Sequence, residues 1–95
     1  MYKLTVVAGP NRGTSYAIQD GENSIGRQAG NAIVLPSSKV SKKHCVLVVS
    51  NGQIVLRDQG SSNGTFVNGV LSKAKPVRVG DRISVGEFVL EVSQP

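Results

Sequence analysis

Hydrophobic and polar positions alternate in short runs along the chain, with a period of two rather than the 3.6 of an amphipathic helix. Ile54 and Leu56 share one face of such a run, and Phe88, Leu90 and Val92 share a face of the last one. Because this spacing is typical of half-buried strands, the pattern predicts strands over residues 3–8, 15–20, 22–26, 32–35, 45–49, 53–57, 65–67, 82–85 and 88–92.

One run departs from the alternation, because residues 45–49 are apolar throughout. A strand that is covered on both faces is one explanation for such a run. Turn signals separate the runs, and Asn51-Gly52 is the strongest of them because both residues accept the positive φ of a type I′ hairpin. Asn68-Gly69 is also interpreted as a hairpin turn. Turns at intervals of roughly 8–12 residues indicate a β-sandwich or a β-barrel.

The composition narrows the classes of protein. A chain of 95 residues is expected to form one domain, residues 1–95. One cysteine cannot form an internal disulfide, and one cysteine with one histidine cannot complete a structural zinc site. No apolar run approaches the ~20 residues of a membrane span, and no signal-peptide pattern begins the chain. The net charge of +5 favours an anionic partner.

Polar and conformationally special residues concentrate in three predicted loops. Gly26-Arg27 ends a strand, and Ser41 and His44 form a Ser-x-x-His motif. The third stretch, residues 58–69, reads Asp-Gln-Gly-Ser-Ser-Asn-Gly-Thr-Phe-Val-Asn-Gly. In this order and spacing the three motifs resemble the forkhead-associated (FHA) domain, over nearly the whole chain. The resemblance implies an all-β sandwich of two mostly antiparallel sheets, with about 10–11 short strands and binding loops at one end.

The resemblance also implies that the chain binds phosphothreonine peptides, as an adaptor in Ser/Thr-kinase signalling. The residue chemistry agrees, because a phosphothreonine carries up to two negative charges and three strong acceptor oxygens. Arg27 offers a guanidinium fork, Ser41 a hydroxyl and Lys42 an ammonium or its backbone N–H. By resemblance, Ser62 and Asn63 meet the peptide beside the phosphothreonine.

Further residues are expected to support or surround this site. By resemblance the ring of His44 braces the loops that hold Arg27 and Ser41, while glycines at 26 and 64 permit the required backbone turns. A rim that attracts acidic peptides and sets specificity is expected from Lys39, Lys43, Gln59 and Ser61. Much of the positive charge is assigned to this rim. Should Lys39 dominate it, an acidic residue three positions after the phosphothreonine is favoured.

Two positions depart from the family pattern. Lys42 stands where arginine or asparagine is usual, so a point-charge donor replaces a fork or an amide. Ala32 stands where an aspartate is usual, which weakens a loop brace rather than a phosphate contact. Neither change removes the candidate site.

Two other functions stay open. A phosphate-independent assembly module of the same fold would bind partners through the sandwich surface alone. A nucleic-acid-binding β-domain is suggested by the basic composition, but a chain with two tyrosines, two phenylalanines and no tryptophan offers few stacking platforms. No catalytic set, cofactor loop or metal set is visible, so we expect a monomeric, cytoplasmic, non-enzymatic module without nucleic-acid or membrane partners.

Overall fold

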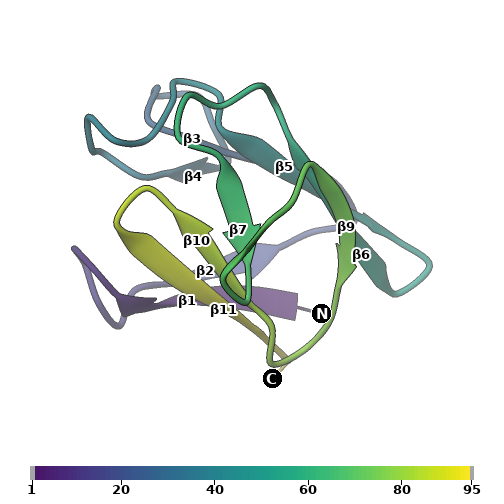
Figure 1. Cartoon of the computed structure of the whole chain (residues 1–95). Helices are drawn as coiled ribbons and strands as arrows, with labels where there is room; N and C mark the ends of the chain where they lie inside the picture. Colours follow the sequence, from purple (N-terminus) through teal and green to yellow (C-terminus); the bar gives the residue numbers. More distant parts are fainter. Residues whose placement is uncertain (1, 95) are drawn as a thin grey trace.

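The computed structural model describes residues 2–94, which form two packed β-sheets (Figure 1). Along these residues run eleven strands: β1 (Tyr2–Ala8), β2 (Ser15–Ile18), β3 (Gly21–Gly26), β4 (Ile33–Val34), β5 (Cys45–Ser50), β6 (Gln53–Asp58), β7 (Thr65–Val67), β8 (Val70–Leu71), β9 (Ala74–Val77), β10 (Arg82–Val85) and β11 (Phe88–Ser93). The same residues contain no helix, and so none long and apolar enough to cross a membrane.

The strands divide between a six-stranded sheet, ordered β2-β1-β11-β10-β7-β8, and a five-stranded sheet, ordered β4-β3-β5-β6-β9. Neighbouring strands pair antiparallel except β3 and β4, which pair in parallel. The predicted sandwich of two mostly antiparallel sheets is therefore confirmed.

The alternation of the sequence places one face of each sheet in the core. Phe88, Leu90 and Val92 of β11 are each at most 1% exposed, and Ile54 and Leu56 of β6 are at most 2% exposed. The predicted hairpin after β5 is present, because Asn51 and Gly52 have φ values of 53° and 75° and Ser50 pairs with Gln53. Asn68 and Gly69 form the β7–β8 turn in the same way, with φ values of 50° and 82°.

The pattern missed two strands and overextended two others. β8 has only two residues, and β9 contains Pro76, which is tolerated because β9 is an edge strand paired only with β6. The predicted strand 15–20 ends at Ile18, because the side chain of Asn23 bonds both the N–H and the C=O of Gln19 and fixes a turn there. The predicted strand 32–35 shortens to β4.

The suggested explanation for the apolar run in β5, a strand covered on both faces, holds only in part. Leu47 and Val49 face the core, whereas Val46 and Val48 face outward, where no second sheet covers them. Val46 is nonetheless buried, with only 7% of its surface exposed, and Val48 is half-buried.

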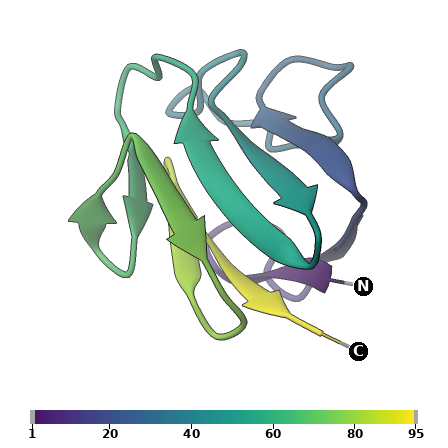
Figure 2. The same cartoon turned by 90° about the vertical axis from the view of Figure 1, so that its right-hand side faces the viewer.

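The loops that carry the three motifs gather at one end of the sandwich. Both views show the β3–β4, β4–β5 and β6–β7 connections at the top of the molecule, away from the two chain ends (Figures 1 and 2). This end presents the candidate site.

Candidate functional site

Gly26 and Arg27, at the end of β3, pack and hydrogen-bond against the β4–β5 loop. The backbone N–H of Arg27 donates to the carbonyl of Ser41 at 2.9 Å, and its Nε donates to the carbonyl of Val40 at 3.0 Å. A Cβ at position 26 would lie 2.1 Å from the carbonyl oxygen of Lys42, so only glycine allows the two segments to approach this closely. The side chain of Arg27 is exposed at the loop end.

His44 links two loops from a fully buried position. Its Nδ1 accepts the backbone N–H of Ser41 at 3.1 Å, and its Nε2 lies 2.8 Å from the carbonyl of Gly64. A carbonyl can only accept, so Nε2 carries the proton and donates to Gly64. The ring therefore joins the loop of Ser41 to the β6–β7 loop, whereas the resemblance implied a brace between the loops of Ser41 and Arg27; toward β3, His44 is linked by its backbone N–H to the carbonyl of Ile25.

Ser41 and Asn63 make further links between the same loops. The Oγ of Ser41 accepts the backbone N–H of Ser62 at 3.0 Å, and the Nδ2 of Asn63 donates to the carbonyl of Lys39 at 2.9 Å. The three motifs, separate in the sequence, thus form one hydrogen-bonded platform. Arg27, Ser41, Lys42, Ser62 and Asn63 all lie on it.

Asp58 organises the β6–β7 loop from within. Its Oδ2 accepts the backbone N–H groups of Gly60 and Ser61, each at 3.0 Å, and its Oδ1 accepts the hydroxyls of Ser61 at 2.5 Å and Thr65 at 2.7 Å. Burial acts to raise the pKa of this carboxyl, but the four hydrogen bonds outweigh it and hold the pKa below its usual value.

Replacing Asp58 with asparagine is expected to lower the free energy of unfolding at neutral pH by roughly 1–2 kcal/mol, because a neutral amide accepts fewer and weaker bonds from the four donors. The depressed native pKa means that this stabilisation is present above the unfolded-state pKa of about 3.9 and is lost as pH falls through the native value. Urea unfolding from neutral to acidic pH checks this. A difference between the two proteins that stays constant down to the lowest pH contradicts it.

Two supporting residues were not assigned a role from the sequence. Asp58 belongs to the third motif, and its spacing to the hydroxyl residues Ser61 and Thr65 could have indicated that it organises the loop. Asn31 donates from Nδ2 to the carbonyls of Gln28 at 2.7 Å and Lys42 at 2.9 Å. It therefore holds the β3–β4 loop although aspartate is missing at Ala32, whose N–H donates to the hydroxyl of Ser24.

The rim residues lie on two sides of the platform. Lys39 borders the β10–β11 turn, where a Cβ on Gly86 would come within 3.3 Å of its backbone carbonyl. Lys43 and Gln59 line a groove on the outer face of the five-stranded sheet. Ser61 differs from these, because its hydroxyl is bonded to Asp58.

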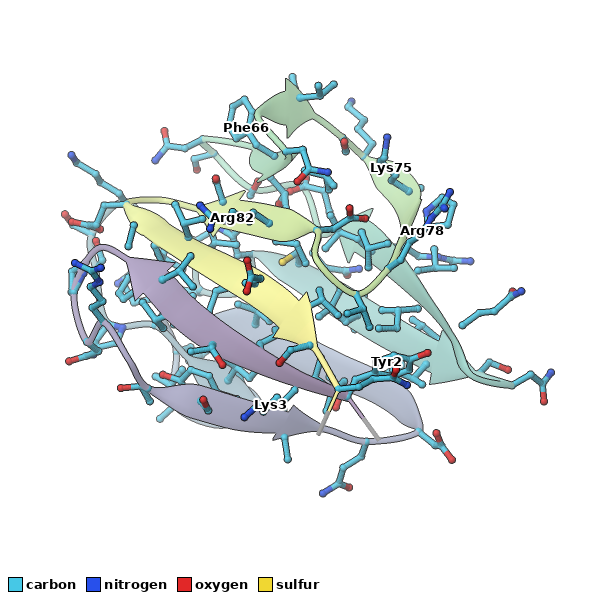
Figure 3. The ribbon with its side chains drawn as sticks, turned by 90° about the horizontal axis from the view of Figure 1, so that it is seen from below. Tyr2, Lys3, Phe66, Lys75, Arg78 and Arg82 are labelled. Carbon is cyan, nitrogen blue, oxygen red and sulfur yellow. The ribbon has the colours of Figure 1, made fainter. Side chains whose placement is uncertain are left out.

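The positive charge is more widely spread than expected. Arg27, Lys39, Lys42 and Lys43 stand at the loop end, and all four are exposed. From below, other cations appear across the opposite part of the molecule: Lys3 on β1, Lys75 on β9, Arg78 after β9 and Arg82 on β10 (Figure 3). Arg82 pairs with Glu91 at 3.3 Å. Only part of the net charge is therefore available to a ligand on the platform.

The platform is suited to binding an anion. Among the hydrogen bonds formed within residues 2–94, the guanidinium of Arg27 uses only Nε, and the hydroxyl of Ser41 acts only as an acceptor. The outer guanidinium nitrogens, the Ser41 O–H and the exposed ammonium of Lys42 are therefore left to donate to a ligand. Over the same residues, no cluster of three or more His, Cys, Asp or Glu side chains is placed to hold a metal ion.

Known proteins resemble this chain in sequence and in structure. The oxoglutarate dehydrogenase inhibitor of Corynebacterium glutamicum is 33% identical over 92% of the chain and 61% of its own length. The glycogen accumulation regulator GarA of Mycolicibacterium smegmatis is 32% identical over 92% of the chain and 55% of its own length. The chain thus spans somewhat more than half the length of these curated relatives.

A solved structure from a study of phosphothreonine-dependent FHA domain interactions superposes with a TM-score of 0.91. It is 28% identical and covers 99% of this chain and 96% of its own. The family model for the FHA domain matches residues 23–86, which include all three motifs and the platform that they form. The chain belongs to the FHA domain family.

Proposed function

We propose that this FHA domain binds a threonine-phosphorylated segment of a partner protein and acts as an adaptor in Ser/Thr-kinase signalling. Arg27, Ser41 and Lys42 bind the phosphate, and Ser62 and Asn63 position the peptide backbone beside it. Gly26, His44 and Gly64 keep these groups in place. The observation that carries the proposal is the platform, in which three loops are hydrogen-bonded together while cationic and neutral donors remain directed to solvent.

The relatives support a regulatory rather than a catalytic role, since one is named an inhibitor and another a regulator. Binding alone needs no cofactor. Burial raises the pKa of the Cys45 thiol to about 12, so this group is a protonated core side chain rather than a nucleophile. We place the protein in the cytoplasm, where such a thiol stays reduced, and expect it to act as a monomer.

The proposal is tested by screening the purified protein against a pool of random peptides with a fixed central phosphothreonine. We expect selected peptides to bind with micromolar affinity at best. Two or three charged hydrogen bonds favour binding, but the entropy lost on association offsets part of their free energy. Phosphatase treatment of the pool should abolish the selection. Binding that is unchanged after phosphatase treatment contradicts the proposal.

A phosphoserine version of a selected peptide, and its unphosphorylated version, should each bind at least tenfold more weakly. Loss of the phosphate removes the charged acceptors, and loss of one methyl group alone is worth only about 0.8 kcal/mol, or fourfold. The larger discrimination requires the methyl group to fix the side-chain rotamer in a small pocket. Calorimetry with the three peptides measures it, and equal affinities for phosphothreonine and phosphoserine contradict it.

We also expect aspartate to be preferred over alanine three positions after the phosphothreonine, since Lys39 is an exposed cation beside Asn63. Peptide arrays on the wild type and on Lys39→Ala measure the preference, which should disappear in the variant. Lys73→Ala is a suitable control, because Lys73 is an exposed cation that lies outside the three loops. Equal binding of aspartate and alanine peptides to the wild type contradicts this expectation.

A phosphate-independent assembly module remains the second candidate, for one structural reason. Val70 and Leu71 of edge strand β8 are each 61% exposed, which is unusual for large apolar side chains. This function predicts partner binding that survives both phosphatase treatment and Ser41→Ala. The phosphothreonine function predicts loss of binding in both cases.

A further inference from the structure

The outer face of the five-stranded sheet carries a groove of about 540 Å³. Cross-strand pairing sets its floor: Val46 lies between Ser24 of β3 and Arg57 of β6, and Val48 lies beside Glu22 of β3. One wall is the β3–β4 loop, which the side chain of Asn31 ties to the carbonyl of Lys42. The groove is thus built from rigid strands and a braced loop.

Two valines form the apolar part of the groove floor. Their neighbours Glu22, Ser24 and Arg57 are polar or charged, as is usual on a solvent-facing sheet surface, whereas Val55 of β6, opposite Val48, extends the apolar strip. Val46, which is 7% exposed, and the half-buried Val48 line the bottom of the hollow. This is the part of the all-apolar run in β5 that core packing does not explain.

The two ends of the groove carry side chains of opposite charge. Lys43 and Arg57 stand at the end near the platform, and Glu22 lies toward the other end. The near end therefore favours an anionic group, while the valines favour an aliphatic one.

The groove adjoins the candidate phosphate site along the chain. Gln28, which lines it, directly follows Arg27, and Lys43 is two residues from Ser41. The backbone N–H of Gln59 donates to the carbonyl of His44 at 2.9 Å. The start of the β6–β7 loop, which also lines the groove, is therefore fixed to the residue that links the loops of the platform. The groove and the platform are therefore built on the same loops.

We propose that the groove holds a second part of the same phosphopeptide: an extended flank with an aliphatic side chain on Val46 and Val48 and a carboxylate at Lys43 and Arg57. This inference rests on the proposed function of the platform. Val46 lies three residues beyond Lys43, which precedes β5, so the two are separated by at most about 10 Å along the chain. The aliphatic residue is therefore expected about three to six positions from the phosphothreonine, on one side of it.

The test uses the protein as it stands and a pool of peptides with a central phosphothreonine and about six random positions on each side. We expect one flank to select Val, Ile or Leu together with Asp or Glu. The selected long peptide should bind about tenfold more tightly than its five-residue phosphothreonine core, by fluorescence anisotropy. Amide NMR signals of Val46, Val48 and Arg57 should shift with the long peptide and not with the core.

Two variants separate the groove from the platform. Arg57→Glu should remove the gain from the long flank, and the nearly isosteric Val48→Thr should reduce it. Both variants should bind the core peptide as the wild type does. Lys3→Glu, an equal charge change on the outer face of the other sheet, should retain the gain.

Equal affinities for the long and core peptides, or a gain that persists in Arg57→Glu, would overturn the groove assignment while the phosphate site stands. If neither peptide binds, or if the core binds equally well to Arg27→Ala, the proposed function fails and the groove assignment fails with it.

Discussion

Replacing Arg27 with alanine is expected to weaken binding of a phosphothreonine peptide by about 10- to 100-fold, because a charged hydrogen bond contributes roughly 1.5–3 kcal/mol. The guanidinium is held by one bond from Nε to the carbonyl of Val40, which orients its outer nitrogens without using them. Most of the side chain therefore serves the ligand rather than the fold. Calorimetry with a library-selected peptide measures the loss.

Two variants make this result specific. Arg27→Lys keeps the charge but loses the planar fork, so its affinity should fall between those of the wild type and Arg27→Ala. Arg82→Ala removes a cation from the outer face of the six-stranded sheet, where it pairs with Glu91, and should leave the affinity unchanged. Affinity of Arg27→Ala within twofold of the wild type, in a protein that unfolds at the same urea concentration, contradicts the phosphate-binding role.

Replacing His44 with alanine is expected to lower the free energy of unfolding by about 2–4 kcal/mol and to weaken peptide binding in the molecules that remain folded. The ring is fully buried, so its removal leaves a cavity. It also leaves the N–H of Ser41 and the carbonyl of Gly64 without their partners. Because these two bonds join the β4–β5 and β6–β7 loops, their loss loosens the platform itself.

Cys45→Ala is the matched control for this change. Cys45 is the next buried residue along the chain; its thiol contacts Thr65 of β7, whereas the bonds to Ser41 and Gly64 belong to His44 alone. Both variants should unfold at lower urea concentrations, but only His44→Ala should lose affinity when binding is measured where both are folded. Equal affinities of the two variants would contradict a positioning role for His44.

Much of the fold could be predicted from the sequence, because alternation identifies strands that have one face in the core. Ile54 and Leu56 are examples, as are Phe88 and Leu90. The strands that escaped prediction lie at sheet edges, where pairing rather than burial defines them. β8 is two exposed residues, and β9 includes a proline, so neither has an apolar alternation.

The platform could be predicted only through the spacing of motifs. Composition and alternation give no reason for Arg27, Ser41 and Asn63 to meet, since they are joined by hydrogen bonds from side chains and backbone groups to the backbone of distant loops. The groove was not predicted, because the apolar run in β5 was interpreted as a strand covered on both faces. Which valines of β5 face outward is determined only by the pairing of β5 with β3 and β6.

The central claim is tested most directly by an NMR titration of the isotope-labelled protein with a selected phosphothreonine peptide, followed by addition of phosphatase. We predict that the largest shifts occur at the amides of Arg27, Ser41, Lys42 and Asn63, and that they revert as the phosphate is removed. Shifts centred on Val70 and Leu71, or shifts that persist after dephosphorylation, would contradict the claim that this platform binds phosphothreonine.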